Sequence, residues 1–340
     1  MTQGRKHLIF VDWMKVIGMY AIILGHFTPP ILQFITYSFS VQLFFFISGF
    51  LFHRENEDKI FWSKNLKLLV IPYFIWGIMR LITYNIKEHD LQTLWHSFTG
   101  LALGCNNLLG ARGCGELWFV VTLLCLKAFS QYVRLNNQRI WIYVGIDLIL
   151  AVIYRNVIHS TVIEFNGIGV FDIFVAFPFF AIGIFVSKFK DMIGSWAEYF
   201  NRHSMTLFLT TITTFLLLVI CAPMNGVVFM VYGQYGNNLL VFILLGCIGI
   251  FAIFIFSLFL SKLSSAAKYA NTINVGSIMI LGLHTIFVNK SKFLIDGLLL
   301  DNKFTHEAAF AVMSLIILLA FIPCINIVKK CIPIALGYRK

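Results

Sequence analysis

The sequence predicts an all-α, polytopic integral membrane protein with about ten transmembrane helices and both termini in the cytoplasm. Three observations support this fold class: the composition, the spacing of the apolar runs, and the distribution of lysine and arginine. Hydrophobic residues make up 59% of the 340 residues and charged residues only 12%, and the mean hydropathy is +0.85. Soluble domains usually carry about 25% charge. Most of the surface is therefore expected to face lipid.

Apolar runs recur along the whole chain, each close to the roughly 20 residues that a helix needs to cross a hydrocarbon core. We expect spans at 8–27, 34–52, 66–86, 115–134, 140–157, 168–187, 203–222, 237–260, 272–290 and 307–328. These runs leave no room for a separate soluble domain. Residues 1–340 are therefore predicted to form a single transmembrane domain.

Turn-forming and polar residues mark the boundaries between the expected spans. Examples are Pro29-Pro30, the charged segment 54–59 and the polar segment 233–238. Segment 91–104 is apolar but short, so we expect an interfacial or re-entrant piece there. The first run is too long for the apolar region of a signal peptide and lacks a cleavage site of small residues. We therefore take residues 8–27 as the first span.

Lysine and arginine orient the chain, because cytoplasmic loops carry an excess of both. Of the 26 such residues, 18 fall on the inner side if the N-terminus is inside, 7 fall on the outer side, and Lys15 lies within the first span. The net charge of +11 is then mostly a signal of topology, and no nucleic-acid partner is expected. The cysteines show no metal-ligand spacing, so no metal is expected. Cys105 and Cys114 share one outer loop and could pair if that side is oxidising.

Ionisable residues inside spans are costly and are functional candidates by default. In the first span, Asp12 and Lys15 are three residues apart and share a helix face. His26 follows Lys15 by eleven residues, about three turns, so it stands on that face roughly 16 Å further along the axis. The alternative is that Asp12 and Lys15 form an interfacial ion pair, with His26 a boundary histidine bonded to a carbonyl.

A second polar stretch lies in the ninth expected span, where Ser277 and His284 are two turns apart. His284 either serves the site or merely bonds a neighbouring helix. Lys64 and Lys67, three residues apart, could grip phosphates, although positive-inside charge explains them equally well. Arg80 is another intramembrane ionisable residue, and the sequence does not identify its partner.

Five segments, in this order, resemble the membrane acyltransferase-3 family of O-acyltransferases. They are Asp12-Trp13-Met14-Lys15 followed by His26, the aromatic run from Phe44 to Leu51, Lys64 and Lys67 followed by Ile71-Pro72-Tyr73, Glu116-Leu117-Trp118-Phe119, and Gly276-Ser277 with His284. Lys15, Lys64 and Lys67 stand where many members of that family have arginine. Lysine keeps the positive charge but lacks the planar guanidinium with which arginine forms bidentate hydrogen bonds.

The resemblance implies ten helices and an O-acetyltransferase that uses acetyl-CoA as co-substrate, with no bound cofactor. The implied acceptor is a hydroxyl of a cell-envelope glycan or lipid-linked sugar. His26 is expected to be the general base, since imidazole titrates near neutral pH, and His284 is expected to be a second catalytic residue. The expected donor-binding residues are Asp12, Lys15, Lys64 and Lys67. Ser48, Glu116, Trp118 and Ser277 are expected to serve the acceptor or the structure.

Donor and base are expected on different sides, because CoA is cytoplasmic while His26 lies near the outer end of its span. One solution is that basic residues at the inner mouth hold the CoA phosphates while the pantetheine arm threads a pore toward His26. We expect a multi-pass protein of the bacterial cytoplasmic (inner) membrane, in contact with lipids, that is compatible with an oligomer.

A secondary transporter or flippase for a glycan or lipid-linked intermediate is the main alternative to an enzyme. Asp12, Lys15 and His26 would then form a proton or substrate path. Paired broken helices and internal symmetry, which often accompany such transporters, are not evident in the sequence. A sensor or scaffold is disfavoured by the number of intramembrane ionisable groups.

Overall fold

The computed structural model describes residues 8–29, 31–85, 90–108, 111–133, 135, 137–158, 165–166, 172–262, 266–297 and 303–337. It confirms an all-α polytopic membrane protein. The α-helices are α1 (Ile9–His26), α2 (Leu32–Phe50), α3 (Asp58–Asn65), α4 (Ile71–Asn85), α5 (Leu91–Leu103), α6 (Trp118–Val133), α7 (Asn137–Ile153), α8 (Ile173–Val186), α9 (Lys190–Arg202), α10 (Ser204–Cys221), α11 (Leu239–Leu260), α12 (Ala267–Val275), α13 (Ser277–Asp296) and α14 (Lys303–Cys331).

Short helical turns connect several of these helices. The π-helical turns are η1 (Leu66–Val70), which joins α3 to α4, and η3 (Tyr154–Ile158), which continues α7. The 3-10 turns are η2 (Gly115–Leu117), η4 (Ser187–Phe189), η5 (Ala222–Asn225), η6 (Met230–Tyr232) and η8 (Pro333–Leu336).

Nine helical stretches in the described part of the chain are long and apolar enough to cross a membrane. They correspond to nine of the ten expected spans. The tenth, at 140–157, is α7, whose α-helical part has 17 residues and continues into the π turn η3. The short segment expected at 91–104 is α5, with 13 residues, which is too short to cross the bilayer.

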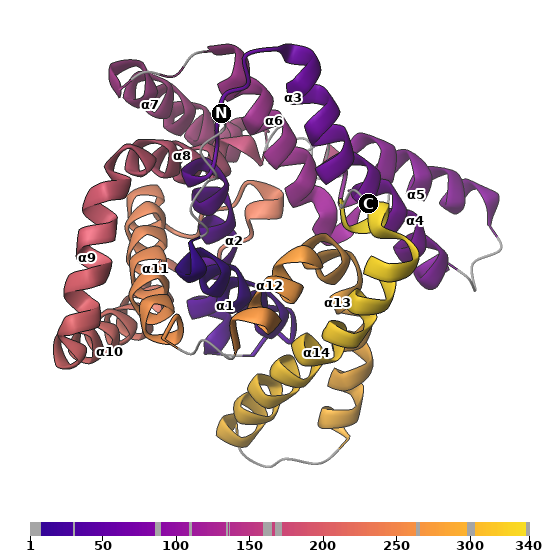
Figure 1. Ribbon diagram of the computed structural model, residues 1–340. Helices are drawn as coiled ribbons and strands as arrows, with labels where there is room; N and C mark the ends of the chain where they lie inside the picture. Colours follow the sequence, from indigo (N-terminus) through magenta and orange to yellow (C-terminus); the bar gives the residue numbers. More distant parts are fainter. Residues whose placement is uncertain are drawn as a thin grey trace.

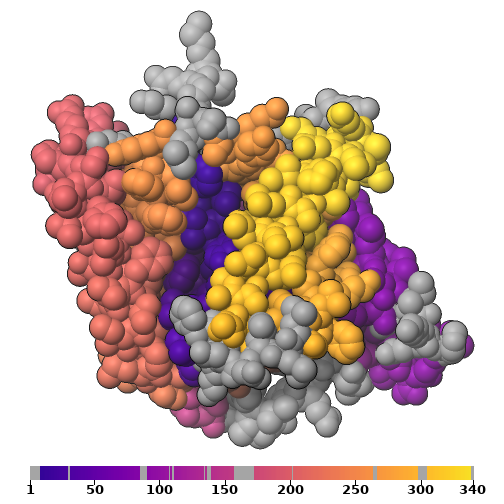
Figure 2. Space-filling model, turned by 90° about the horizontal axis from the view of Figure 1, so that it is seen from below, coloured from indigo at the N-terminus to yellow at the C-terminus, as the bar shows by residue number. Residues whose placement is uncertain are grey.

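Helices α1 and α2 occupy the middle of the bundle (Figure 1) and pack against each other. Helices α8 and α11 pack on α2, while α12, α13 and α14 pack on α1. Figure 2 shows the first turns of α1 and the C-terminal end of the described chain on the same side of the molecule. A chain that crosses the membrane an even number of times has both ends on the same side. The arrangement therefore agrees with α7 as a tenth span.

The α2–α8 contact depends on glycine, because the two backbones touch. A Cβ at Gly49 would overlap the carbonyl oxygen of Phe180, and a Cβ at Gly183 would overlap the carbonyl oxygen of Phe46. Small residues allow such close approach between membrane helices, where packing drives association. Gly49 lies in the aromatic run of α2, next to Ser48. Its contact with α8 therefore helps to position Ser48.

Adding a methyl group at either glycine is expected to destabilise the protein. Gly49→Ala and Gly183→Ala should each lower the free energy of unfolding by about 1–3 kcal/mol, because the overlap is with backbone that cannot move aside. Thermal unfolding in detergent measures this loss. Gly145→Ala is the matched control: its Cβ would meet no atom within 4 Å, so its stability should be unchanged or higher. Equal stability of all three variants would contradict the backbone contact.

A small antiparallel sheet lies at the opposite end of the bundle from the first turn of α1 and the last described residues. It consists of β1 (Asn107–Leu108), β2 (Ala111–Arg112) and β3 (Phe165–Asn166), in the order β2-β1-β3. Cys105 and Cys114 extend the β1–β2 hairpin, where the amide of Cys114 donates to the carbonyl of Cys105 at 2.7 Å. Both cysteines are fully buried. The two cysteines are neighbours, and their pairing on an oxidising side stays a prediction.

Candidate functional site

Two histidines meet where the end of α1 packs against the middle of α13. His284 Nε2 lies 3.3 Å from His26 Nδ1, and the two rings stand almost perpendicular, with centroids 4.7 Å apart. The contact joins residues 258 positions apart in the sequence. The structure therefore brings together the two histidines that the sequence singled out.

The carbonyl groups around the two rings determine their tautomers. His284 Nδ1 lies 2.9 Å from the carbonyl of Ile280 and 3.1 Å from that of Leu281. Two acceptors there require a proton on Nδ1, so the Nε2 of a neutral His284 is an acceptor. His26 Nδ1 must then carry a proton, which it directs at His284 Nε2 and at the Ile22 carbonyl, 2.8 Å away. The unprotonated, basic nitrogen of His26 is Nε2.

Glu116 faces that basic nitrogen. Its Oε1 lies 3.9 Å from His26 Nε2, and its Oε2 lies 3.1 Å from Arg80 Nη2. The hydroxyl of Thr285 donates to Oε2 at 3.4 Å. A carboxylate in this place stabilises the positive charge that His26 acquires when it takes a proton. The structure thus identifies the partner of Arg80, which the sequence left open.

Arg80 is held in place so that Glu116 stays ionised and oriented. Arg80 is 5% exposed, and its guanidinium donates to the carbonyl of Gly113 at 3.2 Å and lies over the ring of Tyr84. A buried carboxylate needs a cation or hydrogen bonds nearby. The ion pair with Arg80 therefore offsets the free-energy cost of burying the Glu116 carboxylate within the membrane region. The sequence signal for this role was an arginine inside an apolar run.

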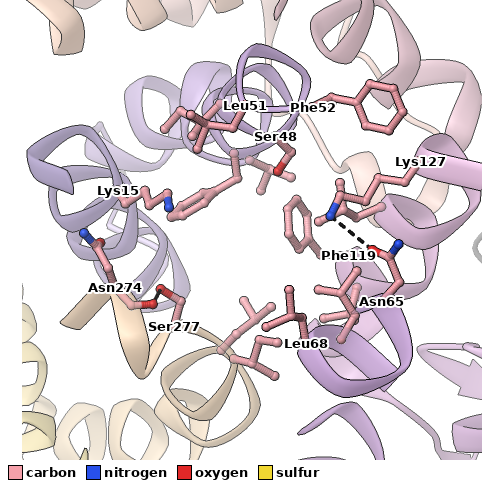
Figure 3. Close-up of a pocket in the computed structure, with 18 of the residues that line it drawn as sticks. Lys15, Ser48, Leu51, Phe52, Asn65, Leu68, Phe119, Lys127, Asn274 and Ser277 are labelled. Atoms are coloured by element: carbon pink, nitrogen blue, oxygen red, sulfur yellow. Dashed lines mark hydrogen bonds between the residues drawn. The ribbon is translucent and has the colours of Figure 1, made fainter. Parts of the chain in front are cut away.

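An inner cavity of about 450 Å³ leads from His26 and Glu116 toward the ends of α1 and α6 that lie on the side of the chain termini. Lys15 and His26 both line it, and eleven residues separate them on α1, so the cavity extends roughly 16 Å along that helix. Next to His26 the walls are mostly apolar, with Ile22 and Phe119 among them. Figure 3 shows the more polar part, with Lys15, Ser48, Lys127, Asn274 and Ser277 around one space.

An outer cavity of about 270 Å³ lies on the other side of the same two residues. Its lining is rich in polar side chains: Arg80, Tyr84, Asn106, Arg112, Tyr232, Thr285 and Asn289, together with His26 and Glu116. Of the described residues, His26 and Glu116 line both cavities. The basic nitrogen and its carboxylate therefore stand at the boundary between a cavity that opens toward the side of the chain termini and a cavity toward the opposite side.

Most of the expected site residues line the inner cavity. They are Lys15, His26, Ser48, Lys64, Glu116, Trp118 and Ser277. Lys64 also pairs with Glu55 at 2.7 Å, and Asp12 lies outside the lining but attracts Lys15 electrostatically. His284 is fully buried and lines neither cavity, so it contacts the site through His26.

Lys67 is placed differently from Lys64. The residues of this helical stretch that line the inner cavity are Phe61, Lys64, Asn65, Leu68 and Leu69. Their spacing is that of one helix face, and Lys67 falls outside it. Lys67 instead lines an adjoining cavity beside Pro333 and Gly337, and Lys64 and Leu68 line both that cavity and the inner one.

The sequence reasoning did not assign Lys127 and Asn274 to the site. Both line the inner cavity, but the sequence does not distinguish Lys127 from the other inner-side charges, and Asn274 has no ionisable group that would single it out. A polar residue on the cavity-facing side of a span was the available signal. Which side faces a cavity emerges only from the packing of the helices.

A sequence model of a family described as an acyltransferase domain matches residues 8–327 of this chain. The match extends from the start of α1 to within α14 and so includes both histidines, Glu116 and the whole inner cavity. Searches of curated proteins and of solved structures gave no match to the chain.

Proposed function

The chain belongs to the acyltransferase-3 family, and from this premise we propose that it is an O-acetyltransferase of the bacterial cytoplasmic (inner) membrane. It transfers the acetyl group of cytoplasmic acetyl-CoA to a hydroxyl of a cell-envelope glycan or lipid-linked sugar. One observation carries the proposal: His26 and Glu116 are shared by two cavities that lie on opposite sides of them. Donor and acceptor then reach one base from opposite sides of the membrane.

The inner cavity suits the donor. Its extent along α1, roughly 16 Å between Lys15 and His26, is comparable with the length of an extended pantetheine arm. Its cations lie at the inner end and its apolar walls near His26, which matches a donor with phosphates at one end and a neutral thioester at the other. Because the Lys/Arg bias places this end in the cytoplasm, acetyl-CoA enters from the side on which it is made.

The outer cavity suits a sugar acceptor. Tyr84 and Tyr232 supply aromatic rings, and Asn106 and Asn289 supply amide groups that donate to and accept from hydroxyls. The hydroxyl to be acetylated would point at His26 Nε2. This arrangement keeps the acceptor outside while its reacting oxygen meets the thioester at the boundary between the cavities.

The geometry supports a general-base mechanism in two steps. His26 Nε2 takes the proton of the acceptor hydroxyl as its oxygen attacks the thioester carbonyl, forming the C–O bond of a tetrahedral intermediate. The intermediate then breaks its C–S bond, and the leaving CoA sulfur takes the proton from His26. Glu116 stabilises the imidazolium of His26 between the two steps. Before the reaction, the hydrogen bond to His284 keeps the proton of His26 on Nδ1, so that His26 Nε2 is unprotonated.

A secondary transporter or flippase is a second candidate, because two cavities meeting at an ionisable pair also describe a transport path. Purified protein in detergent distinguishes the two functions. We expect it to consume acetyl-CoA and to transfer labelled acetyl to envelope glycans, and to do so without a membrane gradient. Protein that is monodisperse and stable but leaves acetyl-CoA intact in the presence of acceptor would favour the transporter.

The orientation of the chain follows from the charge bias and has a direct test. In a variant without the native cysteines, Glu57→Cys should resist a membrane-impermeant thiol reagent in intact cells, because the segment before α3 is predicted to be cytoplasmic. Asn302→Cys, at a position outside the described residues, should react. Labelling of position 57 from outside would reverse the orientation and place the donor cavity on the wrong side.

A further inference from the structure

Lys127 is a cation in the inner cavity without a close anion. In the described chain, its Nζ finds only the side-chain oxygen of Asn65, at 3.2 Å, and no carboxylate within 4.0 Å. Glu55 lines the same cavity and attracts Lys127 electrostatically, but its carboxylate already pairs with Lys64 at 2.7 Å. A largely enclosed ammonium is costly without a counter-charge. The arrangement of Lys127 therefore points to an anion that the protein itself does not supply.

Lys127 lies level with Lys15 on the opposite wall. Helix α1 runs from Lys15 toward His26, whereas η2 and α6 run the other way, from Glu116 toward Lys127. Each pair is eleven residues apart, so both lysines lie roughly 16 Å from the base. Figure 3 shows the two side chains on opposite sides of the cavity, with the Lys127–Asn65 hydrogen bond drawn beside them.

Asn274 adds an unsatisfied neutral group on the Lys15 side of the cavity. Its side-chain nitrogen and oxygen are both buried and have no hydrogen-bond partner within the described structure. Buried amides are nearly always paired, and each exception needs an explanation. Figure 3 places Asn274 beside Ser277 and across the space from Asn65. A ligand amide that passes this point would satisfy both of its atoms.

We propose that Lys127 and Lys15 bind the diphosphate of the donor between them and that Asn274 hydrogen-bonds an amide of its pantetheine arm. The inference rests on the proposed function and names the groups that recognise the donor. The diphosphate lies level with the two lysines, the arm passes Asn274 and Ser277, and the thioester reaches His26. Lys127, rather than Lys67, supplies the second cation, because Lys127 lines the inner cavity and Lys67 lines only the adjoining one.

Binding of free CoA, which cannot react, tests the proposal without the chemistry. We expect Lys127→Met in nanodiscs to raise the Kd of CoA by about 10-fold to 100-fold, the range for a lost charge-assisted hydrogen bond. Dephospho-CoA keeps the diphosphate, so its Kd should rise by the same factor in Lys127→Met. Pantetheine lacks the diphosphate and should bind the wild type and Lys127→Met with the same Kd. Lys127→Arg should retain most of the affinity. Lys330→Gln, which removes an exposed charge at the same end of the molecule, should leave the Kd unchanged.

Asn274→Leu should change the Kd of CoA and of pantetheine in a different pattern from Lys127→Met. Its Kd should rise for CoA and for pantetheine alike, by about 5-fold to 10-fold, because the arm is common to both. The ligand-free protein gives a further readout. Lys127→Met should be as heat-stable as the wild type or more so, since it replaces a charge without a counter-ion by a side chain of similar volume.

Separate outcomes overturn the inference and the proposed function. Wild-type protein that transfers acetyl, together with an unchanged Kd of CoA in Lys127→Met, overturns the inference alone. A loss of CoA affinity in Lys67→Gln but not in Lys127→Met has the same meaning, as does a large loss of stability in ligand-free Lys127→Met. Folded wild-type protein that neither binds CoA nor consumes acetyl-CoA overturns the proposed function itself.

Discussion

His26→Ala is expected to lower the rate of acetyl transfer by about 10²-fold to 10⁴-fold, the usual contribution of a general base. The imidazole has its unprotonated nitrogen at the boundary of the two cavities, facing Glu116 at 3.9 Å, and a methyl group can accept no proton there. The fold should survive, because the His26 side chain is 27% exposed and projects into space. Binding of free CoA should change little.

The assay is acetyl transfer by detergent-purified variants matched for monodispersity and thermal stability. Gly145→Ala, at a helix position with open space around it, serves as a control for purification and handling. If His26→Ala keeps near-wild-type turnover while His284→Ala is inactive, the base has been assigned to the wrong helix. If both variants remain active, the acyltransferase mechanism proposed above is wrong.

The spans and the general location of the site were predictable from sequence because both depend on local patterns. A run of about 20 apolar residues has one stable solution in a bilayer, and nine expected spans correspond to crossing stretches. Similarly, the spacing from Lys15 to His26 alone determines that both share a face of α1. The structure confirms this, since both line the inner cavity.

The pairing of residues between helices was not predictable, because it depends on how helices far apart in the chain pack. The sequence listed Arg80 and Glu116 but had no means to join them, and their contact arises where α4 meets the turn before α6. The binding role of Lys127 was not predictable for a different reason. Positive-inside charge and a ligand-binding lysine have the same sequence pattern, and only the cavity distinguishes them.

Both simple alternatives for the histidines are also partly present in the structure. His26 does bond a carbonyl, that of Ile22, and His284 does bond a neighbouring helix. These bonds do not compete with a role in the site. They hold the proton of each ring on Nδ1, and that leaves His26 Nε2 free for a substrate proton.

The His284 contact therefore leads to a prediction distinct from that for the base. His284→Leu should lower kcat by about 10-fold to 100-fold, by analogy with the loss when a hydrogen-bond partner that orients a metal-bound histidine is removed. The KM for acetyl-CoA should change little, because His284 lines neither cavity. His26 would keep the Ile22 carbonyl as an acceptor, so the loss should be smaller than that in His26→Ala.

His284→Gln separates positioning from packing. Its side-chain oxygen can accept the proton of His26 Nδ1, so it should recover much of the turnover that His284→Leu loses, although both replace a fully buried ring. A purely structural histidine would show the opposite order, because leucine suits an apolar helix contact better than an amide does. Turnover, KM and thermal stability measured on both variants decide between the two roles. If Gln and Leu reduce turnover equally, and only in proportion to lost stability, His284 does not orient the base.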